Sequence, residues 1–372
     1  MSASTPFGVV LVVGGCGFLG HHLVEEVVKR DGQQTKIAVM DVNTERNRHP
    51  AATYYAADVT ARDQIQKVLE EVKPRVIFHT VSPSPFEKDR NLLEKVNVTG
   101  TQHLIDCAKA VGTVKAFVYT CSSSIIHNQR DPMVDATEEL PVLYYPEQSE
   151  YYSHTKALAE DIVLGANRSG GNMLTVSIRP ATLNGPGDMI ITKTLAEQAL
   201  TGRAKYHFGD GKNLFDICYV KNCTDAQFLA AQALIDASTA EPLPQDKRVE
   251  GEAFLVSNDE HVPFWDLQRI AAEIAQCPVK PGEIQAIPRW FMMAGAFVGE
   301  WGYWISTQGK QQPPVTRYIV NITTMERTVC IDKIKTRLGY RPRFNTREGL
   351  QKGITWYLET HAKSRAPPQQ RN

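Results

Sequence analysis

An apolar run that ends abruptly in glycines constrains this chain most: residues 9–20 read VVLVVGGCGFLG. The valines and leucine are typical of a strand buried on both faces, and the glycines let the backbone turn sharply and approach a ligand closely. The backbone N–H groups at the start of the following helix would then face a bound phosphate. The run therefore predicts a phosphate-binding turn between a strand and a helix.

Two spacings fit this turn: Gly14, Gly17 and Gly20 at intervals of three, or Gly15 with Gly17 and Gly20 as G-x-G-x-x-G. A second apolar strand, residues 36–40, ends at Asp41, 21 positions after Gly20. A dinucleotide-binding fold places the acidic residue that binds the adenosine ribose at about this distance. An acidic residue there also disfavours the 2′-phosphate of NADP, so we expect NAD.

Strand and helix patterns continue to alternate after Asp41. Apolar strands are expected near residues 53–57, 75–79, 115–119 and 174–178, with helices at 61–72 and 92–111 between them. This order predicts right-handed βαβ units and a Rossmann-type, doubly wound parallel sheet of the α/β class. We expect an NAD-binding domain over residues 1–185, a smaller substrate-binding lobe over 186–360 that interleaves with the last strands of the sheet, and a disordered tail over 361–372.

Composition excludes several classes of protein. Lysine plus arginine equals aspartate plus glutamate at 41 each, so no net positive charge recruits nucleic acid. The seven cysteines show no C-x-x-C spacing, so we expect neither a zinc site nor a disulfide framework, and no metal. The first apolar run follows no basic segment and precedes no cleavage site, so no signal peptide is expected.

Two polar motifs lie at the expected carboxyl edge of the sheet. The strand at 115–119 opens into Thr120-Cys-Ser-Ser-Ser124, and Tyr152-Ser-His-Thr-Lys156 opens a helical stretch expected over residues 155–164. Residues four apart share a helix face, so the Tyr152 phenol and the Lys156 ammonium can point into one cleft. An ammonium nearby favours the phenolate, which gives tyrosine a route to general-base catalysis.

On these motifs the chain resembles the extended short-chain dehydrogenases/reductases. The resemblance implies that Tyr152 is the general base, that Lys156 stabilises its phenolate and binds the nicotinamide ribose, and that Ser122 holds the substrate oxygen, with Ser123 as the alternative. Asn97 matches the family's supporting asparagine. The resemblance also favours the spacing with Gly14, Gly17 and Gly20.

The cofactor site expected from the resemblance takes in residues from each strand end. Besides Asp41, Tyr152, Lys156 and the three glycines, we expect contacts from the following residues: Phe18, Leu19, Asp58, Val59, Thr80, Pro180, Ala181, Thr182 and Leu183.

Three later segments resemble the 3β-hydroxysteroid dehydrogenase branch: residues 213–222, 254–265 and 331–342. The resemblance implies oxidation of the 3β-hydroxyl of a 4α-carboxysterol by NAD and loss of carbon dioxide from the β-keto acid, as in sterol C4 demethylation. Met189 departs from the branch, which often has arginine there. A related steroid, terpenoid or polyketide alcohol stays open as substrate, as do a nucleotide-sugar epimerase and a non-catalytic NAD(P)-sensing regulator.

Residues 290–305, WFMMAGAFVGEWGYWI, place aromatic side chains at helical spacing. The apolar run is short for a membrane-spanning helix. Two interpretations stay open: a core helix or wall of a sterol pocket, and a helix that inserts into a membrane interface. We expect a peripheral, cytosol-facing protein at the endoplasmic reticulum, with the cytoplasm as the alternative, acting as a homodimer or within a sterol demethylation complex.

Overall fold

A computed structural model describes residues 5–169, 172–308 and 313–361. The tail expected to be disordered lies outside these residues except for His361. A seven-stranded parallel sheet has the order β12-β7-β5-β4-β1-β2-β3. Its strands are β1 (Val9–Val13), β2 (Lys36–Asp41), β3 (Ala52–Ala56), β4 (Val76–His79), β5 (Ala116–Thr120), β7 (Leu174–Pro180) and β12 (Glu252–Val256). The predicted Rossmann-type sheet is confirmed.

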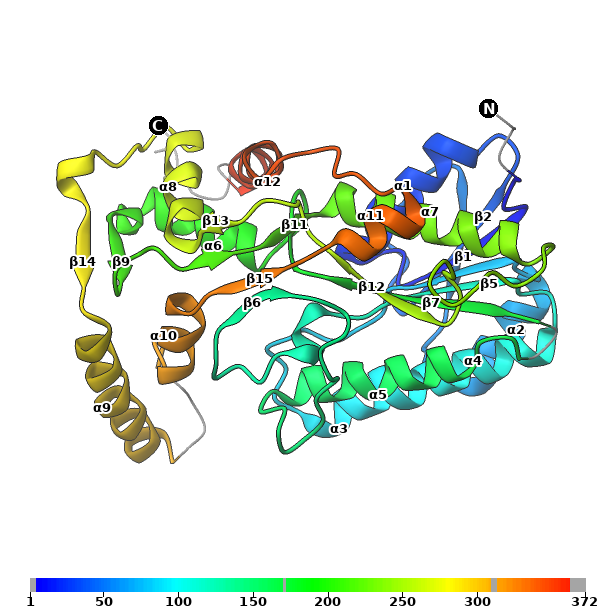
Figure 1. The fold of residues 1–372 in the computed structure, drawn as a ribbon, viewed down its shortest axis with the longest axis horizontal. Helices are drawn as coiled ribbons and strands as arrows, with labels where there is room; N and C mark the ends of the chain where they lie inside the picture. The colour runs from blue at the N-terminus through cyan, green and yellow to red at the C-terminus, as the bar shows by residue number, and fades with distance from the viewer. Residues whose placement is uncertain (1–4, 170–171, 309–312, 362–372) are drawn as a thin grey trace, which may run out of the picture.

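Helices cover both faces of the sheet (Figure 1). One layer holds α2 (Arg62–Val72), α4 (Gly100–Val111) and α5 (Tyr151–Gly165); the other holds α1 (Phe18–Asp31), α7 (Val220–Ala237) and α11 (Asp332–Leu338). With both faces covered, the strands are apolar throughout, and Val10 to Val13 of β1 are fully buried. The core of the molecule lies between these layers.

The helix expected at 92–111 is interrupted. It starts as α3 (Arg90–Leu93), widens into a π-helical turn, η1 (Glu94–Thr99), and continues as α4. The interruption contains Asn97. Such π turns are rare and occur frequently at functional sites. The α5 helix, in turn, begins at Tyr151, four residues before the predicted helical stretch, so Tyr152 lies in its first turn.

The remaining elements build the lobe at the other end of the molecule (Figure 1). A four-stranded sheet has the order β13-β10-β15-β6, and two-stranded pairs join β11 with β8 and β14 with β9. The strands are β6 (Met133–Ala136), β8 (Thr182–Asn184), β9 (Tyr206–Phe208), β10 (Leu214–Phe215), β11 (Ile217–Tyr219), β13 (Val262–Pro263), β14 (Gln285–Ile287) and β15 (Arg327–Val329). The helices are α6 (Ile191–Leu200), α8 (Phe264–Ile274), α9 (Arg289–Thr307), α10 (Arg317–Thr324) and α12 (Thr346–His361), with short 3₁₀ turns η2 (Ser123–Ile126), η3 (Arg203–Lys205) and η4 (Pro281–Glu283).

Late segments of the chain return to the central sheet. Strand β12 pairs with β7, and Phe254 and Leu255 are fully buried there. A small second core forms where α6, α8 and α12 meet, around Leu195, Phe215 and Leu267. The division at residue 185 stays a prediction.

The aromatic helix α9 is neither a core helix nor the wall of an enclosed pocket. Ala296 alone is buried among its residues, whereas Trp290 is 72% exposed, Trp304 60% and Ile305 69%. The interpretation of this segment as a core helix is therefore wrong. The spacing of the aromatic residues correctly predicts a helix, but such spacing does not reveal whether other parts of the chain cover one face of that helix.

Candidate active site

The turn between β1 and α1 is closed by steric contacts that only glycine permits. A Cβ on Gly20 would lie 2.1 Å from the carbonyl oxygen of Gly14, and one on Gly15 would lie 2.7 Å from Cγ1 of Val39. Gly14 has φ +85°, and a Cβ there would lie 2.8 Å from Oγ1 of Thr80. All three positions therefore need glycine, whichever spacing is used to describe the motif.

The N-terminus of α1 is open to an anion. Gly17 is its N-cap, no side chain caps it, and its first turn holds no acidic residue. Its first N–H groups, on Phe18 and Leu19, can therefore bind a phosphate, which the helix dipole favours. The close turn and this helix start fit the pyrophosphate of a dinucleotide.

Asp41 lies against the same turn. One of its carboxylate oxygens accepts a hydrogen bond from the N–H of Cys16 at 3.1 Å, and the other accepts one from the N–H of Asn43 at 3.2 Å. Asn47 closes the following loop, donating from Nδ2 to the Cys16 carbonyl oxygen at 2.9 Å. The structure thus places Asp41 beside the glycine turn, where a ribose next to the pyrophosphate would lie.

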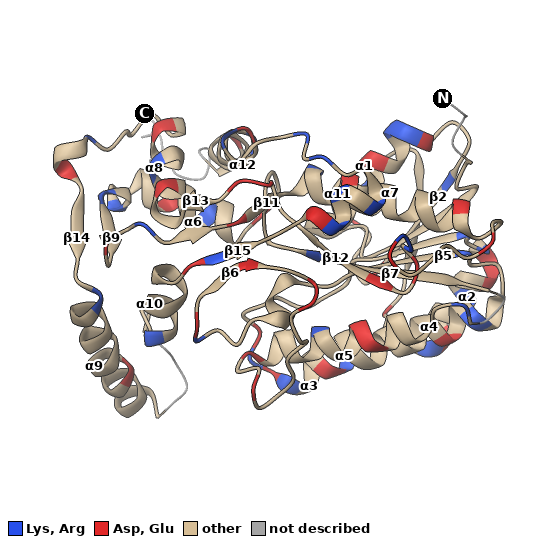
Figure 2. Cartoon of the chain, viewed as in Figure 1, with Lys and Arg blue, Asp and Glu red and all other residues tan. Residues whose placement is uncertain are grey.

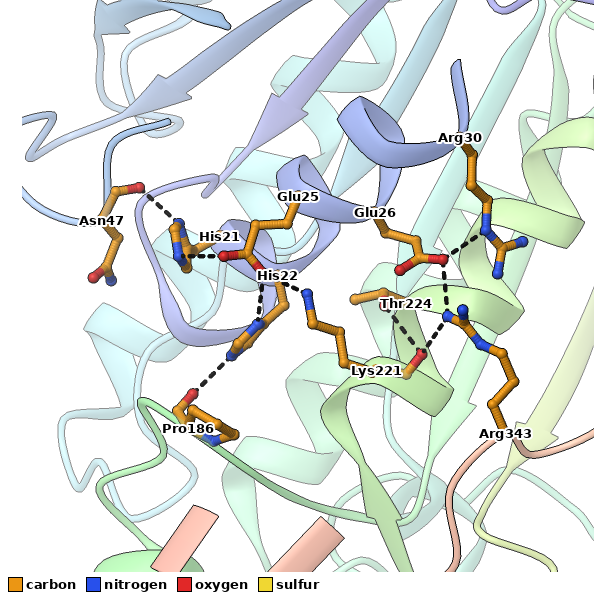
Figure 3. A network of polar contacts seen from close by, with 10 residues as sticks. All are labelled: His21, His22, Glu25, Glu26, Arg30, Asn47, Pro186, Lys221, Thr224 and Arg343. Carbon is orange, nitrogen blue, oxygen red and sulfur yellow. Dashed lines mark hydrogen bonds and ion pairs between the residues drawn. The ribbon is translucent and has the colours of Figure 1, made fainter. Parts of the chain in front are cut away.

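Figure 3 shows how α1 is held in place. His21 Nδ1 lies 2.8 Å from the carbonyl oxygen of Asn47, and His22 Nε2 lies 2.7 Å from that of Pro186. Glu25 pairs with Lys221 of α7 and with both histidines, which lowers the pKa of Glu25 and raises that of His21. These contacts fix the helix against the loops on both sides of the turn.

A second set of ion pairs lies one turn further along α1 (Figure 3). The buried Glu26 accepts from Arg30 Nε at 2.6 Å and from Arg343 Nη2 at 2.8 Å. Arg30 also pairs with Asp225 of α7. The charges of two acids and two arginines therefore cancel, and their ion pairs connect α1 to α7 and to the segment after α11.

The serine cluster and the start of α5 form one hydrogen-bonded unit. Ser122 Oγ lies 2.8 Å from Ser124 Oγ, and Ser153, next to Tyr152, donates to Ser124 Oγ at 2.8 Å. Ser123 is buried within the 3₁₀ turn, whereas Ser122 is partly exposed. This arrangement favours Ser122 over Ser123 as the hydroxyl that can reach a substrate.

Lys156 is a buried cation. It is 2% exposed, and its Nζ donates to the carbonyl oxygen of Thr120 at 2.6 Å and lies 4.3 Å from the centre of the Tyr119 ring. Burial lowers its pKa to about 8. Burial also raises the pKa of Tyr152 to about 12, so the expected lowering of the tyrosine pKa is not seen in this structure. The physical reason is that desolvation, to which the nearby Cys121 thiol adds, disfavours the phenolate more than a hydrogen bond with Ser82 favours it.

Asn97 supports the same helix from the opposite side. It is buried, and its Nδ2 donates to Oγ1 of Thr155 at 3.0 Å, while Thr155 donates to the carbonyl oxygen of Tyr152 at 2.9 Å. The Asn97 Oδ1 is buried and accepts no hydrogen bond from any described residue. Asn97 therefore positions the Tyr152 turn and keeps one acceptor for a further donor.

The other expected cofactor contacts lie at the ends of neighbouring strands. Thr80 follows β4 and donates to the carbonyl oxygen of Val13 at 2.9 Å. Asp58 accepts from the N–H of Thr60, and Val59 packs against Gly100. Pro180 ends β7, Ala181 bonds to β12, and Thr182 and Leu183 lie in β8. Because the strands of this sheet, among them the neighbours β1, β4, β5 and β7, are parallel, these residues lie together at the carboxyl ends of the strands.

Sequence reasoning missed three polar groups near this edge. Thr155 connects Asn97 to the Tyr152 turn, and Gln148 donates to the carbonyl oxygens of Ser124 and His127 at 3.0 and 2.9 Å. Asn184 is fully buried with no partner for either side-chain polar atom among the described residues. Thr155 lies inside the Tyr-to-Lys motif and could have been noticed, but the other two have no local pattern.

The parallel sheet, covered by helices on both faces, defines a Rossmann-type α/β fold. A UDP-glucose 4-epimerase from Thermotoga maritima is similar over 95% of this chain and 99% of its own, with a TM-score of 0.69 and 18% identity. A dTDP-glucose 4,6-dehydratase from Bacillus anthracis, solved with NAD, has a TM-score of 0.68 at 18% identity and covers 95% of this chain and 98% of its own.

The 3-beta hydroxysteroid dehydrogenase/isomerase family matches residues 11–278, and the chain belongs to that family. A decarboxylating sterol-4-alpha-carboxylate 3-dehydrogenase from Saccharomyces cerevisiae is 33% identical over 94% of this chain and 98% of its own. A protein of the same name from Bos taurus is 33% identical over 92% of this chain and 90% of its own. The resemblance noted in the sequence is confirmed.

Proposed function

We propose that this protein oxidises the 3β-hydroxyl of a 4α-carboxysterol with a nicotinamide cofactor and releases carbon dioxide. The observation that carries the proposal is the match of nearly the whole chain to decarboxylating sterol-carboxylate dehydrogenases. It is supported by hydrogen bonds that link the end of β5 and the turn after it, which holds Ser122, to Ser153 and Lys156 of the helix that carries Tyr152. A nicotinamide cofactor bound there supplies a hydride acceptor.

The residues of the chain divide the remaining work. Ser122 donates a hydrogen bond to the oxygen of the 3β-hydroxyl, and Tyr152 accepts the proton of that hydroxyl as general base. The Lys156 ammonium, four residues along the same helix face, stabilises the resulting phenolate. Asn97 and Thr155 hold the first turn of α5 in position. Loss of carbon dioxide needs no further group, because the new ketone accepts the electrons of the breaking bond.

Asp41 supports NAD rather than NADP as the cofactor. Its carboxylate is 8% exposed beside the glycine turn, where a 2′-phosphate would meet a negative charge at close range. Arg48, an arginine in the following loop, lies with Cζ 4.5 Å from the centre of the Tyr54 ring. We expect Asp41→Asn to reduce the ratio of kcat/KM for NAD over NADP by about 10-fold, as one lost charge contact costs roughly 1.4 kcal/mol. An unchanged ratio would remove Asp41 from the ribose site.

The exposed face of α9 supports a peripheral site on the cytosolic surface of the endoplasmic reticulum membrane. The helix carries two charged residues, Arg289 and Glu300, and is otherwise uncharged (Figure 2). Arg289 hydrogen-bonds to Asn321 and Thr324, and Glu300 pairs with Arg317. Its tryptophans face outward, and tryptophan favours the headgroup region of a bilayer. No helix in the part of the chain that the structure describes is long and apolar enough to span a membrane.

Vesicle flotation tests this membrane contact. The double variant Trp301→Ser with Trp304→Ser should lose about 10-fold in binding to vesicles, since the two indoles contribute most of the exposed aromatic surface at one end of α9. Phe86→Ser is the matched control, because Phe86 is also 59% exposed but lies far from α9 in sequence. Equal binding by all three proteins, or self-association that the double variant abolishes, would contradict a membrane contact.

Product analysis tests the function itself. Purified protein incubated with NAD and a 4α-carboxysterol should give a 3-ketone lacking the carboxyl group, read by mass spectrometry, with NADH formed in step. Interconversion of UDP-sugars without any sterol oxidation would identify an epimerase and overturn the proposal.

A further inference from the structure

Arg327 is a partly buried arginine without a counter-ion. It begins β15, an inner strand that pairs with Phe215 of β10 on one side and Met133 of β6 on the other. Its Nε is shut off from solvent and donates no hydrogen bond to any described residue. No described Asp or Glu forms an ion pair with its guanidinium, and its Cζ lies 5.2 Å from the centre of the Phe215 ring.

Arginines that lie beside buried acids elsewhere in the described chain are paired. Arg179 donates from Nε to both oxygens of Glu160 at 3.0 Å, and Arg30 pairs with Glu26 and Asp225. An unpaired charge in a partly buried place is costly, and proteins usually supply its partner. Burial accordingly lowers the pKa of Arg327 from its ordinary value. The missing partner is an anion that the described chain does not provide.

Strand pairing places Arg327 near the candidate active site: it pairs with Met133 of β6, the strand that follows the serine cluster and η2 (Ser123–Ile126) in the chain. Its charge acts on His127, whose carbonyl oxygen is joined through Gln148 to that of Ser124. It also acts on Tyr318 of α10, and Tyr318 in turn is near enough to Glu150 to feel its charge. Glu150 is the N-cap residue of α5, two positions before Tyr152. Arg327 therefore lies on the lobe side of the serine cluster and the first turn of α5.

The other cations of this region lie in a pocket that also contains acids. Arg130, Lys212 and Arg289 line one surface pocket, but Asp210 and Glu326 line it too. Arg289 is further engaged by hydrogen bonds to Asn321 and Thr324. Arg327 is different because an aromatic ring, and no acid, lies against its guanidinium.

We propose that Arg327 binds the carboxylate of the substrate and so determines the preference of the enzyme for an acidic sterol. The proposal rests on the proposed function, because it assigns a residue to the group that distinguishes a 4α-carboxysterol from a plain 3β-hydroxysterol. A planar guanidinium can donate two parallel hydrogen bonds to a carboxylate, and such charge-assisted pairs are strongest where water is excluded. Phe215, beneath the guanidinium, excludes water from one side of the pair.

A matched pair of substrates tests this assignment. The rates of NADH formation are compared for a 4α-carboxysterol and its methyl ester, which keeps the shape but removes the charge. Arg327→Gln should reduce the ratio of kcat/KM for acid over ester by roughly 30-fold, in the range for truncating a buried charge pair. Arg130→Gln, which removes an exposed arginine of the same lobe, should keep the wild-type ratio.

The outcomes separate the two proposals. A wild-type ratio in Arg327→Gln overturns the role of Arg327, while oxidation of the acid by the wild type still supports the proposed function. Where the wild type oxidises neither sterol, the proposed function fails, and equilibrium binding of the acid and ester to both proteins decides the role of Arg327. Should Arg327→Gln melt below the assay temperature, Arg327→Lys replaces it, and its ratio should fall about 5-fold because an ammonium lacks the planar pair of donors.

Discussion

The first helix of the nucleotide-binding half, α1, and the aromatic helix of the lobe, α9, hold their side chains in opposite ways. In α1, seven residues are buried, and Glu25, Glu26 and Arg30 are paired with α7, Arg343 or each other (Figure 3). In α9, Ala296 alone is buried, and the apolar residues face outward. The α1 helix is fixed in place behind the glycine turn, whereas α9 exposes an apolar surface.

The two helices indicate which groups, backbone or side chain, carry the proposed functions in each half of the molecule. At the glycine turn, function depends on the backbone, and a single added carbon would meet another backbone atom. In the lobe, the functions that we propose depend on side chains, namely the exposed α9 tryptophans and Arg327, whose Nε has no partner among the described residues. Changes in the first half should therefore affect cofactor binding and catalysis, and changes in the lobe should affect which partner or substrate is chosen.

Tyr152→Phe should give the largest effect, a loss of turnover of about 10³-fold, since a positioned general base contributes 10²–10⁴-fold. Removing one oxygen leaves the glycine turn untouched, so NADH binding, measured by fluorescence, should stay within about twofold. Turnover close to wild type would show that another group takes the proton.

Gly20→Ala tests the backbone side of the comparison. The new Cβ would lie 2.1 Å from the Gly14 carbonyl oxygen, so we expect a loss of about 4 kcal/mol in the free energy of unfolding and of most NADH affinity. Urea denaturation and fluorescence titration measure both. Gly165→Ala is the control, because a Cβ added at Gly165 would have nothing within 4 Å. The free energy of unfolding of this variant should rise by up to about 1 kcal/mol, because alanine has the higher helix propensity. Equal stability of the two variants would contradict the steric account.

Lys156→Met tests the cost of the buried ammonium. The pKa of Lys156 falls from 10.5 to about 8 on folding, so the unfolded chain binds its proton more tightly. Below pH 8 the amine is charged in both the folded and the unfolded chain, so its burial lowers the free energy of unfolding by the full amount. This cost decreases as the pH rises through 8 and disappears above 10.5, where the amine is neutral in both states. The variant should exceed wild type by about 3 kcal/mol at pH 7, with the gap closing towards pH 10.5, while its turnover falls.

Chemical denaturation at a series of pH values measures that gap. Lys67→Met is the control, because Lys67 is exposed on α2 and should give a gap near zero at every pH. A gap for Lys156→Met that does not change with pH would show that the ammonium is not destabilised by burial.

The sequence predicted the nucleotide-binding half well because its signals are local. The glycine turn and the apolar strands each follow from sterics within a few dozen residues, whereas the binding of a ribose by Asp41 stays a prediction. The π turn at Asn97 could not be predicted, because a helix pattern does not show an extra residue in one turn. The pKa of Tyr152 could not be predicted either, because desolvation depends on neighbours from distant strands.

The lobe was harder to predict because its contacts join distant segments. Arg327 is the first residue of a three-residue strand, and its sequence context is typical of a solvated charge until β6 and β10 are placed on either side of it. The aromatic spacing of residues 290–305 fits a core helix and a surface helix equally well, and only its lack of covering neighbours decides between them.

The central claim is that one active site oxidises the sterol alcohol and so releases its carboxyl group. The most direct measurement uses a 4α-carboxysterol labelled with deuterium at C3 and with heavy carbon in the carboxyl group, incubated with NAD. The account predicts deuterated NADH and labelled carbon dioxide in equal amounts, and neither from Tyr152→Phe. Deuterated NADH with the labelled carboxyl retained in a product stable to isolation would contradict it.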